Sequence, residues 1–270
     1  MTKKMKIMAT GAAVPALLAL GMQVAGANPV TANYNFAPSA SVGFEDIVGP
    51  FDTYDLANGV ALVESVTGSL FAPLVGNTST TYFQAHLQAH QLGANTVSSP
   101  GLGLGNYEIT VVADFQDIVT SVSPFGVSTM VTGGTAKLYF DTTPDKNYIS
   151  DSGFTGQDIL ITGNIIGGIG SLSPSLGVGF EAITVQVTSF DSNVFTPSIF
   201  GANGIFTLDI RSSSINGVTS VQGHAFNAGA DILIGADGNL QLSAVPVPAA
   251  VWMLGSALVG MVTIRRRPQG

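Results

Sequence analysis

A period-two alternation of apolar and polar residues restricts the fold of this chain more than any other feature. From Tyr107 to Phe115 every second residue is apolar, and similar alternation recurs at residues 137–141, 183–188 and 206–211. Successive side chains of a strand point to opposite faces of a sheet, so this period is typical of half-buried β-strands. The middle of the chain is therefore predicted to be a series of strands.

Connections rich in glycine and serine separate these stretches, and we expect loops at residues 101–105, 121–134 and 163–170. Residues 236–238 (Ala-Asp-Gly) contain a hairpin turn signal. They would join the short strand candidates at residues 231–234 and 239–242. Two further short candidates are residues 158–161 and 220–226. Residues 55–74 are less clear and could hold a short helix, although Gly59, Gly68 and Pro73 argue against it.

Strands with one polar face and Gly/Ser-rich connections are typical of an antiparallel sandwich. We therefore predict a single all-β, antiparallel β-sandwich-like domain over residues 28–243. The chain has no cysteine, so disulfides and thiolate zinc sites are excluded. A domain of about 215 residues can bury a sufficient core without such crosslinks.

The N-terminus has the pattern of a secretory signal peptide, which we place at residues 1–27. Lys3, Lys4 and Lys6 precede a mostly small and apolar stretch, and Ala25 and Ala27 form an A-x-A cleavage site. The alternative is a first transmembrane helix. Glycine, proline and glutamine residues interrupt the apolar stretch and disfavour that alternative. Export of the following domain is the expected outcome.

The C-terminus, residues 244–270, is predicted to be a sorting signal with a transmembrane helix. Its apolar run extends to Ile264, about 16 to 20 residues, which just spans a bilayer core as a helix. The arginine cluster after the run marks the cytoplasmic side. The residues assigned to the signal are Val245, Pro246, Val247, Pro248, Ala249, Ala250, Trp252, Arg265, Arg266 and Arg267.

This order of short proline motif, apolar helix and terminal arginines resembles the PEP-CTERM sorting signal of exported bacterial proteins. The resemblance implies processing by an exosortase in Gram-negative bacteria with exopolysaccharide-rich envelopes. Here Val245 to Ala249 stands where the motif would read Pro-Glu-Pro, and this departure leaves the processing point open. The alternative is an ordinary C-terminal membrane anchor.

The charge balance argues against binding to nucleic acid. The whole chain has 9 Lys+Arg and 17 Asp+Glu, a formal net charge of −8. Six of the nine basic residues lie in the two terminal signals, so the exported part carries 3 − 17 = −14. Nucleic acid requires clustered Lys and Arg.

The strongest candidate metal pair is His86 and His90. On a helix this spacing would place both rings on one face. On a strand they lie roughly 13 Å apart, too far to share an ion. The alternating sequence favours the strand, with Gln84, His86, Gln88 and His90 as a polar row on an exposed face. We therefore assign no metal site here.

Residues 141–151 contain several hard oxygen ligands, which is the chemistry that calcium prefers. The EF-hand pattern fails at Lys146 and Ser152, however, and Asp, Asn, Thr and Pro are also typical of a plain hairpin loop. No glycine-rich phosphate loop and no Gly-x-Ser-x-Gly motif occurs, and no spacing selects a catalytic triad around His86, His90 or His224. We assign no catalytic residue and no cofactor, with calcium in this loop kept as an alternative.

Stretches at residues 105–115, 138–145 and 187–191 resemble PEP-CTERM proteins associated with flocculation. The resemblance implies a non-enzymatic exported protein of the cell surface or extracellular matrix that promotes aggregation, flocculation or biofilm structure. Its partners would be the secretion machinery and exosortase during export, the membrane before processing, and exopolysaccharide afterwards. The alternatives are a calcium-dependent glycan-binding module and a secreted hydrolase.

Overall fold

The computed structural model describes residues 29–35, 45–103, 105–124, 126–173, 178–201, 203–211 and 216–243. The secondary structure of this part consists of β-strands, and the paired strands are antiparallel. This confirms the predicted all-β antiparallel class. No described segment forms a helix that could span a membrane. The predicted signal peptide, with Ala25 and Ala27, and the predicted sorting signal at residues 244–270 lie outside the described residues.

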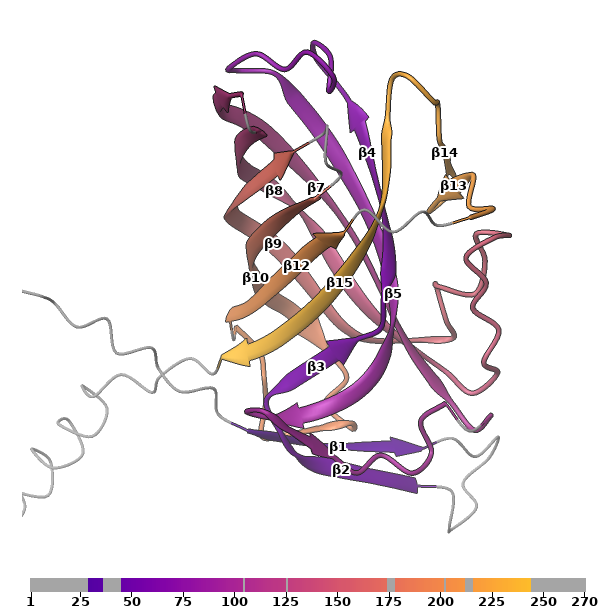
Figure 1. Ribbon diagram of the computed structural model, residues 1–270. Helices are drawn as coiled ribbons and strands as arrows, with labels where there is room; N and C mark the ends of the chain where they lie inside the picture. The colour runs from indigo at the N-terminus through magenta and orange to yellow at the C-terminus, as the bar shows by residue number, and fades with distance from the viewer. Residues whose placement is uncertain are drawn as a thin grey trace, which may run out of the picture.

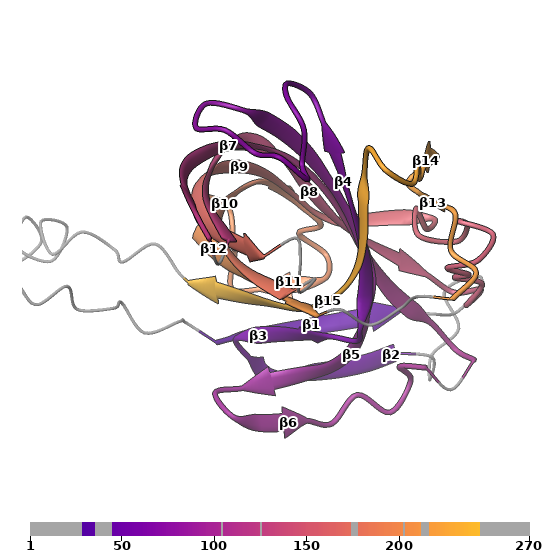
Figure 2. The ribbon, with the colours of Figure 1, turned by 45° about the horizontal axis from the view of Figure 1, so that its top comes forward.

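The long strands form one sheet that closes on itself (Figures 1 and 2). Around the ring, β12 pairs with β10, then follow β9, β8, β7 and β5; β3 and β4 share the next position, and β15 returns to β12. The ring strands are β3 (Thr53–Leu56), β4 (Gly59–Ser65), β5 (Thr78–Leu92), β7 (Glu108–Ser123), β8 (Gly126–Asp141), β9 (Asp158–Ser173), β10 (Val178–Phe190), β12 (Asn203–Arg211) and β15 (Ile232–Ser243).

This closed, barrel-like sheet of eight strand positions replaces the predicted two-sheet sandwich. The physical reason lies in strand length and in one pairing. Strands β5, β7, β8 and β9 contain 15 or 16 residues, so their twist accumulates over a long path. Pairing of β12 with β15 over residues 203–211 then joins the two ends of the sheet and removes its free edges.

The interior of the ring is filled by the apolar residues of the alternating stretches. Tyr107, Ile109, Val111, Ala113 and Phe115 are all buried, as the sequence predicts. They meet inward-facing residues of the other strands in one core, which includes Phe83, Leu138, Ile183, Val185, Val187, Phe206, Leu208 and Leu240. The core therefore lies inside the ring and not between two stacked sheets.

A second small sheet lies across one end of the ring, at the bottom of Figure 1. It consists of β1 (Val30–Asn35), β2 (Glu45–Phe51) and β11 (Phe195–Thr196), while β6 (Asn95–Val97) pairs with β5 nearby. Tyr34 of β1 packs on Phe140 and Tyr107 with ring centroids 5.8 and 5.4 Å apart. The Tyr107 hydroxyl donates to Asp46 Oδ2 at 2.6 Å. Aromatic side chains therefore close this end.

Two long connections cover part of the outer surface, on the right in Figure 1. Residues 142–157 follow β8, and residues 216–231 carry the short hairpin of β13 (Ser220–Val221) and β14 (His224–Ala225). Val218 and Val221 pack on Val60 and Leu62 of β4 in a separate apolar cluster. This outer layer fixes both connections against the ring.

Several predicted loops are strands instead. Residues 163–170 lie inside β9, most of residues 121–134 belong to β7 and β8, and the predicted turn at residues 236–238 lies inside the single strand β15. The glycines of β9 reflect close packing: a Cβ on Gly168 would lie 2.5 Å from Ala182 O. Glycine was therefore a poor indicator of turns in this chain.

Candidate functional site

A polar cleft of about 400 Å³ lies on the outer face of β5, β7 and β8. Gln84, Val112 and Lys137 are partners across these three strands, and Asp114 is paired with Thr135 in the adjacent row. Their side chains face outward because the alternate residues fill the interior of the ring. The floor of the cleft is therefore a regular sheet surface that carries amide, carboxylate, ammonium and hydroxyl groups.

The two outer connections form the walls of the cleft, and Asp151 joins them. Asp151 Oδ1 accepts hydrogen bonds from Gln84 Nε2 at 3.0 Å and from Gln222 N at 2.9 Å. Its Oδ2 accepts a hydrogen bond from Gly223 N at 2.7 Å. One carboxylate thus links the segment 142–157, the segment 216–231 and strand β5.

The Gln222 side chain bridges two strands of the floor. Its Nε2 donates to Phe83 O at 2.7 Å and to Ala113 O at 3.0 Å. Asp151 and Gln222 both have a left-handed backbone, with φ of 52° and 55°. Left-handed backbone is uncommon for residues other than glycine and is held in place by its surroundings. The two walls therefore meet at a strained and highly cross-linked point.

Electrostatics also stabilise the ionised form of Asp151. Burial alone would raise its pKa, but hydrogen bonds from Gly223, Gln84, Ser220 and Gln222 outweigh burial and lower the pKa below its usual value. The carboxylate is therefore charged over the whole physiological pH range.

Glu108 at the start of β7 anchors the wall formed by residues 142–157. Its side chain is buried, with 3% exposed. Glu108 Oε1 accepts hydrogen bonds from Asp145 N at 2.8 Å and Lys146 N at 3.0 Å, and Oε2 pairs with Lys146 Nζ at 3.0 Å. Such charge-assisted hydrogen bonds are among the stronger ones in proteins.

The volume and lining of the cleft suit a small polar ligand or one part of a polymer. About 400 Å³ lies within the roughly 300–1,000 Å³ range of sites for small molecules. Asp114 and Lys137 offer an anion and a cation, and hydroxyl groups are present on the floor and walls. The lining hydroxyl residues are Thr135, Tyr139, Ser152 and Thr155. These groups can exchange hydrogen bonds with a polyol.

The predicted exposed row of Gln84, His86, Gln88 and His90 is wrong for three of its four members. Gln84 is buried beneath the cleft walls, and His86 is half-buried with Nδ1 3.0 Å from the Tyr148 hydroxyl. Burial, together with the charge of Lys146, lowers the pKa of His86 to about 4. Gln88 alone is exposed as predicted.

His90 lies in the core because the pairing of β5 shifts at Gln88. Asp55 pairs with Ala89 and Leu56 with Leu87, so Gln88 has no partner in β3 and the inward phase changes from odd to even positions. His90 is 0% exposed, and burial lowers its pKa to about 3. The strand prediction itself is confirmed, so the two histidines do not share an i, i+4 helical face.

The His90 ring bridges a serine and a tyrosine. Its Nδ1 lies 2.7 Å from Ser99 Oγ and its Nε2 lies 2.9 Å from the Tyr34 hydroxyl. A Ser–His contact is one element of a hydrolase, but a phenol and not a carboxylate occupies the other side of this ring. The third histidine, His224, stacks on Tyr82 with ring centroids 3.7 Å apart.

Asp141 and Asp151, the acids at the two ends of the predicted calcium loop, both accept hydrogen bonds from protein groups. Asp141 Oδ1 accepts a hydrogen bond from Thr143 N at 2.7 Å, as in an Asx turn. Asp151 bridges the cleft walls, as described above. In the described part of the chain, no three His, Asp or Glu side chains are grouped so that they could hold a metal ion. Calcium binding by this loop stays a prediction.

The sequence contains no signal for the cleft. Gln84 and Gln222 are 138 residues apart, and glutamines in polar segments are not conspicuous. The alternation predicts only that Asp114, Lys137 and Tyr139 lie on the polar faces of their strands, and not that they line a cleft.

The fold and the cleft define an all-β domain with a closed antiparallel sheet and a polar site on its outer face. Comparison of this chain with models of protein families, with curated proteins and with solved structures finds no match.

Proposed function

We propose that the chain is a non-enzymatic exported protein of the cell surface or extracellular matrix that promotes cell aggregation, flocculation or biofilm structure together with exopolysaccharide. The observation that carries the proposal is the outer cleft, because its lining of carboxylate, ammonium, amide and hydroxyl groups suits hydrogen bonding to sugar hydroxyls. The net charge of −14 between the predicted signals would keep such a protein soluble outside the cell.

The sorting part of the proposal rests on the sequence of the two ends. A signal peptide at residues 1–27 would direct export, and a transmembrane helix in residues 244–270 would hold the protein in the inner membrane until an exosortase processes it. Both segments lie outside the described residues.

We expect a strain that lacks the gene to lose aggregation and to regain it with the full-length chain. A form without residues 245–270 should be released into the medium and fail to restore aggregation. Normal aggregation of the deletion strain would contradict the proposed function. A truncated form that stays attached to cells and restores aggregation would contradict the sorting assignment.

The cleft can be tested separately from the cell. Replacement of Asp114 and Lys137 by alanine is expected to weaken binding to immobilised polysaccharide at least tenfold, because it removes both charged groups of the floor. Purified dextran and alginate serve as neutral and acidic probes in a sedimentation assay. Asn164→Ala and Gln186→Ala, at exposed positions of β9 and β10 outside the cleft, are the matched controls. Equal binding of cleft and control variants would show that the cleft is not the contact.

A specific glycan-binding module is the second candidate, and the cross-linked walls at Asp151 favour it. Rigid walls reduce the entropy lost on binding and so support a defined ligand. Saturable binding of one oligosaccharide in the cleft, in place of weak binding to many polymers, would favour this candidate. The hydrolase alternative receives no support from His90, because its ring is fully buried and faces a phenol.

A further inference from the structure

Two acidic side chains continue the inward-facing rows of the closed sheet. Asp117 follows Phe115 on β7, and Glu181 precedes Ile183 on β10, in phase with the apolar residues. Both are almost completely buried, with 3% and 6% exposed. Carboxylates are rarely buried to this extent without a partner of opposite charge.

The two carboxyl groups lie together and are incompletely satisfied. Asp117 Oδ2 accepts a hydrogen bond from Thr81 Oγ1 at 3.1 Å. Asp117 Oδ1 and Glu181 Oε2 receive no hydrogen bond from a donor group of the described residues, and the two carboxyls are close enough to share a proton. Gly170 makes room for this pair, since a Cβ there would lie 2.7 Å from Glu181 Cγ and 2.5 Å from Thr129 Oγ1.

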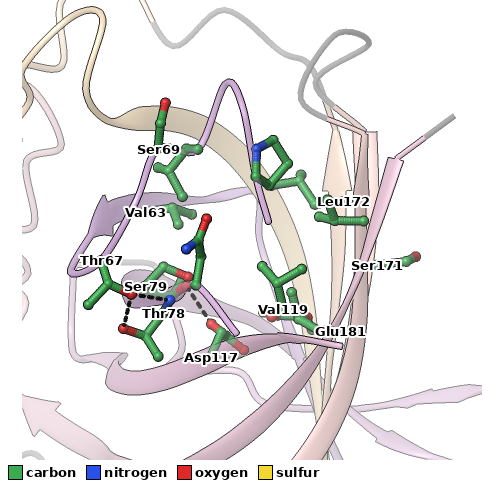
Figure 3. A pocket seen from close by; sticks show the side chains of 16 residues that line it. Val63, Thr67, Ser69, Thr78, Ser79, Asp117, Val119, Ser171, Leu172 and Glu181 are labelled. Carbon is green, nitrogen blue, oxygen red and sulfur yellow. Dashed lines mark hydrogen bonds between the residues drawn. The ribbon is translucent and has the colours of Figure 1, made fainter. Parts of the chain in front are cut away.

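Both acids line a cavity (Figure 3) at the end of the ring opposite the small sheet, at the top of Figure 1. The segment at residues 66–77 covers it, with Thr67 and Ser69 in the lining. The lining residues come from β4, β5, β7, β8, β9, β10 and this segment, and Asp117 and Glu181 are the titratable ones among those described. No lysine, arginine or histidine in this described lining balances the pair.

Ionisation of both carboxyl groups is therefore energetically unfavourable. Burial raises the pKa of Asp117 to about 6. Burial and then the charge of Asp117 raise the pKa of Glu181 well above its usual value. The pair therefore holds a proton at higher pH than exposed carboxylates do, unless another cation takes its place.

The cavity limits which cation can enter. The volume of the cavity is about 40 Å³, a tenth of the volume of the outer cleft. The cavity therefore has room for about three molecules of the size of water. A sugar ring or a peptide does not fit. The polar groups in the lining include the hydroxyls of Ser79, Thr81 and Thr129, which are hard oxygen ligands.

We propose that Asp117 and Glu181 form a binding site for one divalent cation, Ca²⁺ or an ion of similar size, at the covered end of the closed sheet. Calcium is held by carboxylate and other oxygen ligands, and its coordination is completed by water. One such ion neutralises both carboxylates and contacts both unsatisfied oxygens. This inference is independent of the proposed polysaccharide contact, which involves the opposite face of the sheet.

Calorimetric titration of the full-length chain in mild detergent with CaCl₂ tests the proposal. We expect one Ca²⁺ per chain, a rise in melting temperature, and release of about one proton per ion. Proton release is measured by comparing buffers with different ionisation enthalpies. Because the ion replaces the proton, affinity should rise with pH over the range in which the pair loses that proton. Absence of binding up to millimolar CaCl₂ would overturn the proposal.

Variants locate the ion. Glu181→Gln and Asp117→Asn keep the side-chain shape and should each weaken Ca²⁺ binding at least tenfold, and circular dichroism checks that each variant is folded. Asp141→Asn, in the loop where the sequence suggests calcium, is the control and should bind normally. Loss of binding in Asp141→Asn but not in the pair variants would refute this site. Binding of dextran and alginate should be unchanged in Glu181→Gln, so the cation site and the cleft can fail independently.

Discussion

The Glu108→Ala variant is expected to lose about 2–4 kcal/mol of unfolding free energy and, with it, the shape of the outer cleft. The substitution removes a buried carboxylate that accepts three hydrogen bonds. Asp145 N and Lys146 N would then lack their partner, and Lys146 would lose its counter-charge. Breaking one side of a buried pair is more costly than the pair is favourable, because the remaining groups stay desolvated.

The loss should reach the cleft even though Glu108 does not line it. Residues 142–157 carry Asp151, and Asp151 links the two walls. We therefore expect Glu108→Ala to weaken polysaccharide binding as well as stability, while Glu108→Gln, which retains an acceptor oxygen, has an intermediate effect. Chemical denaturation and the sedimentation assay measure the two effects.

Asp158→Ala is the control for this prediction, because Asp158 is an exposed acid at the start of β9. Its unfolding free energy should change by less than about 0.5 kcal/mol. If Glu108→Ala were as stable as this control, the hydrogen bonds of Glu108 would not be needed to hold residues 142–157 against the sheet.

The second large effect is expected in acid. His90 has a pKa of about 3 in the folded protein because it is buried, whereas an exposed histidine has a pKa of about 6.5. As the pH falls from 6.5 towards 3, the unfolded chain binds a proton at this position that the folded chain does not bind. Stability is therefore lost as the pH falls, by roughly 3 kcal/mol from this residue between pH 6.5 and pH 4.

His86 acts in the same direction, with its pKa lowered to about 4. Asp117 and Glu181 act in the opposite direction, because their raised pKa values let the folded chain hold protons that the unfolded chain releases. These contributions to the pH dependence of stability partly cancel. The contribution of His90 must therefore be isolated by substitution.

His90→Gln provides the isolation, since glutamine can still hydrogen-bond but does not titrate. Its unfolding free energy at pH 7 should be lower than that of the parent, because the ring contacts with Phe51 and Tyr54 are lost. Between pH 6.5 and pH 4 the parent should then lose roughly 3 kcal/mol more than the variant. Gln88→Ala, an exposed neighbour on the same strand, should retain the slope of the parent. Parallel pH profiles for the parent and His90→Gln would contradict a neutral, buried His90.

The strands could be predicted because burial on one face imposes a local period on the sequence. The row from Tyr107 to Phe115 is buried as its alternation predicts. Closure of the sheet could not be predicted, because it depends on which distant strands pair, and β12 and β15 meet only in the folded chain. The glycines led to wrong predicted strand boundaries. Gly168 and Gly238 lie where strands pack closely and not where the chain turns.

The sites divide in the same way. Asp117 and Glu181 stand in phase with apolar rows, so each could have been noticed as a charge at an inward position. That the two rows face one another inside the ring requires the topology. The position of His90 depends on one unpaired residue, Gln88, which shifts the phase of β5 and leaves no signature in the local pattern.

The closed sheet also bears on what kind of material the protein could build. Within the described ring, each strand position is paired on both sides over most of its length, so its long strands offer little open backbone on which another molecule could add a strand. Copies of this ring would not polymerise into amyloid-like fibres through these strands. A floc built with it should therefore disperse when its glycans are digested and should not bind dyes that recognise stacked strands.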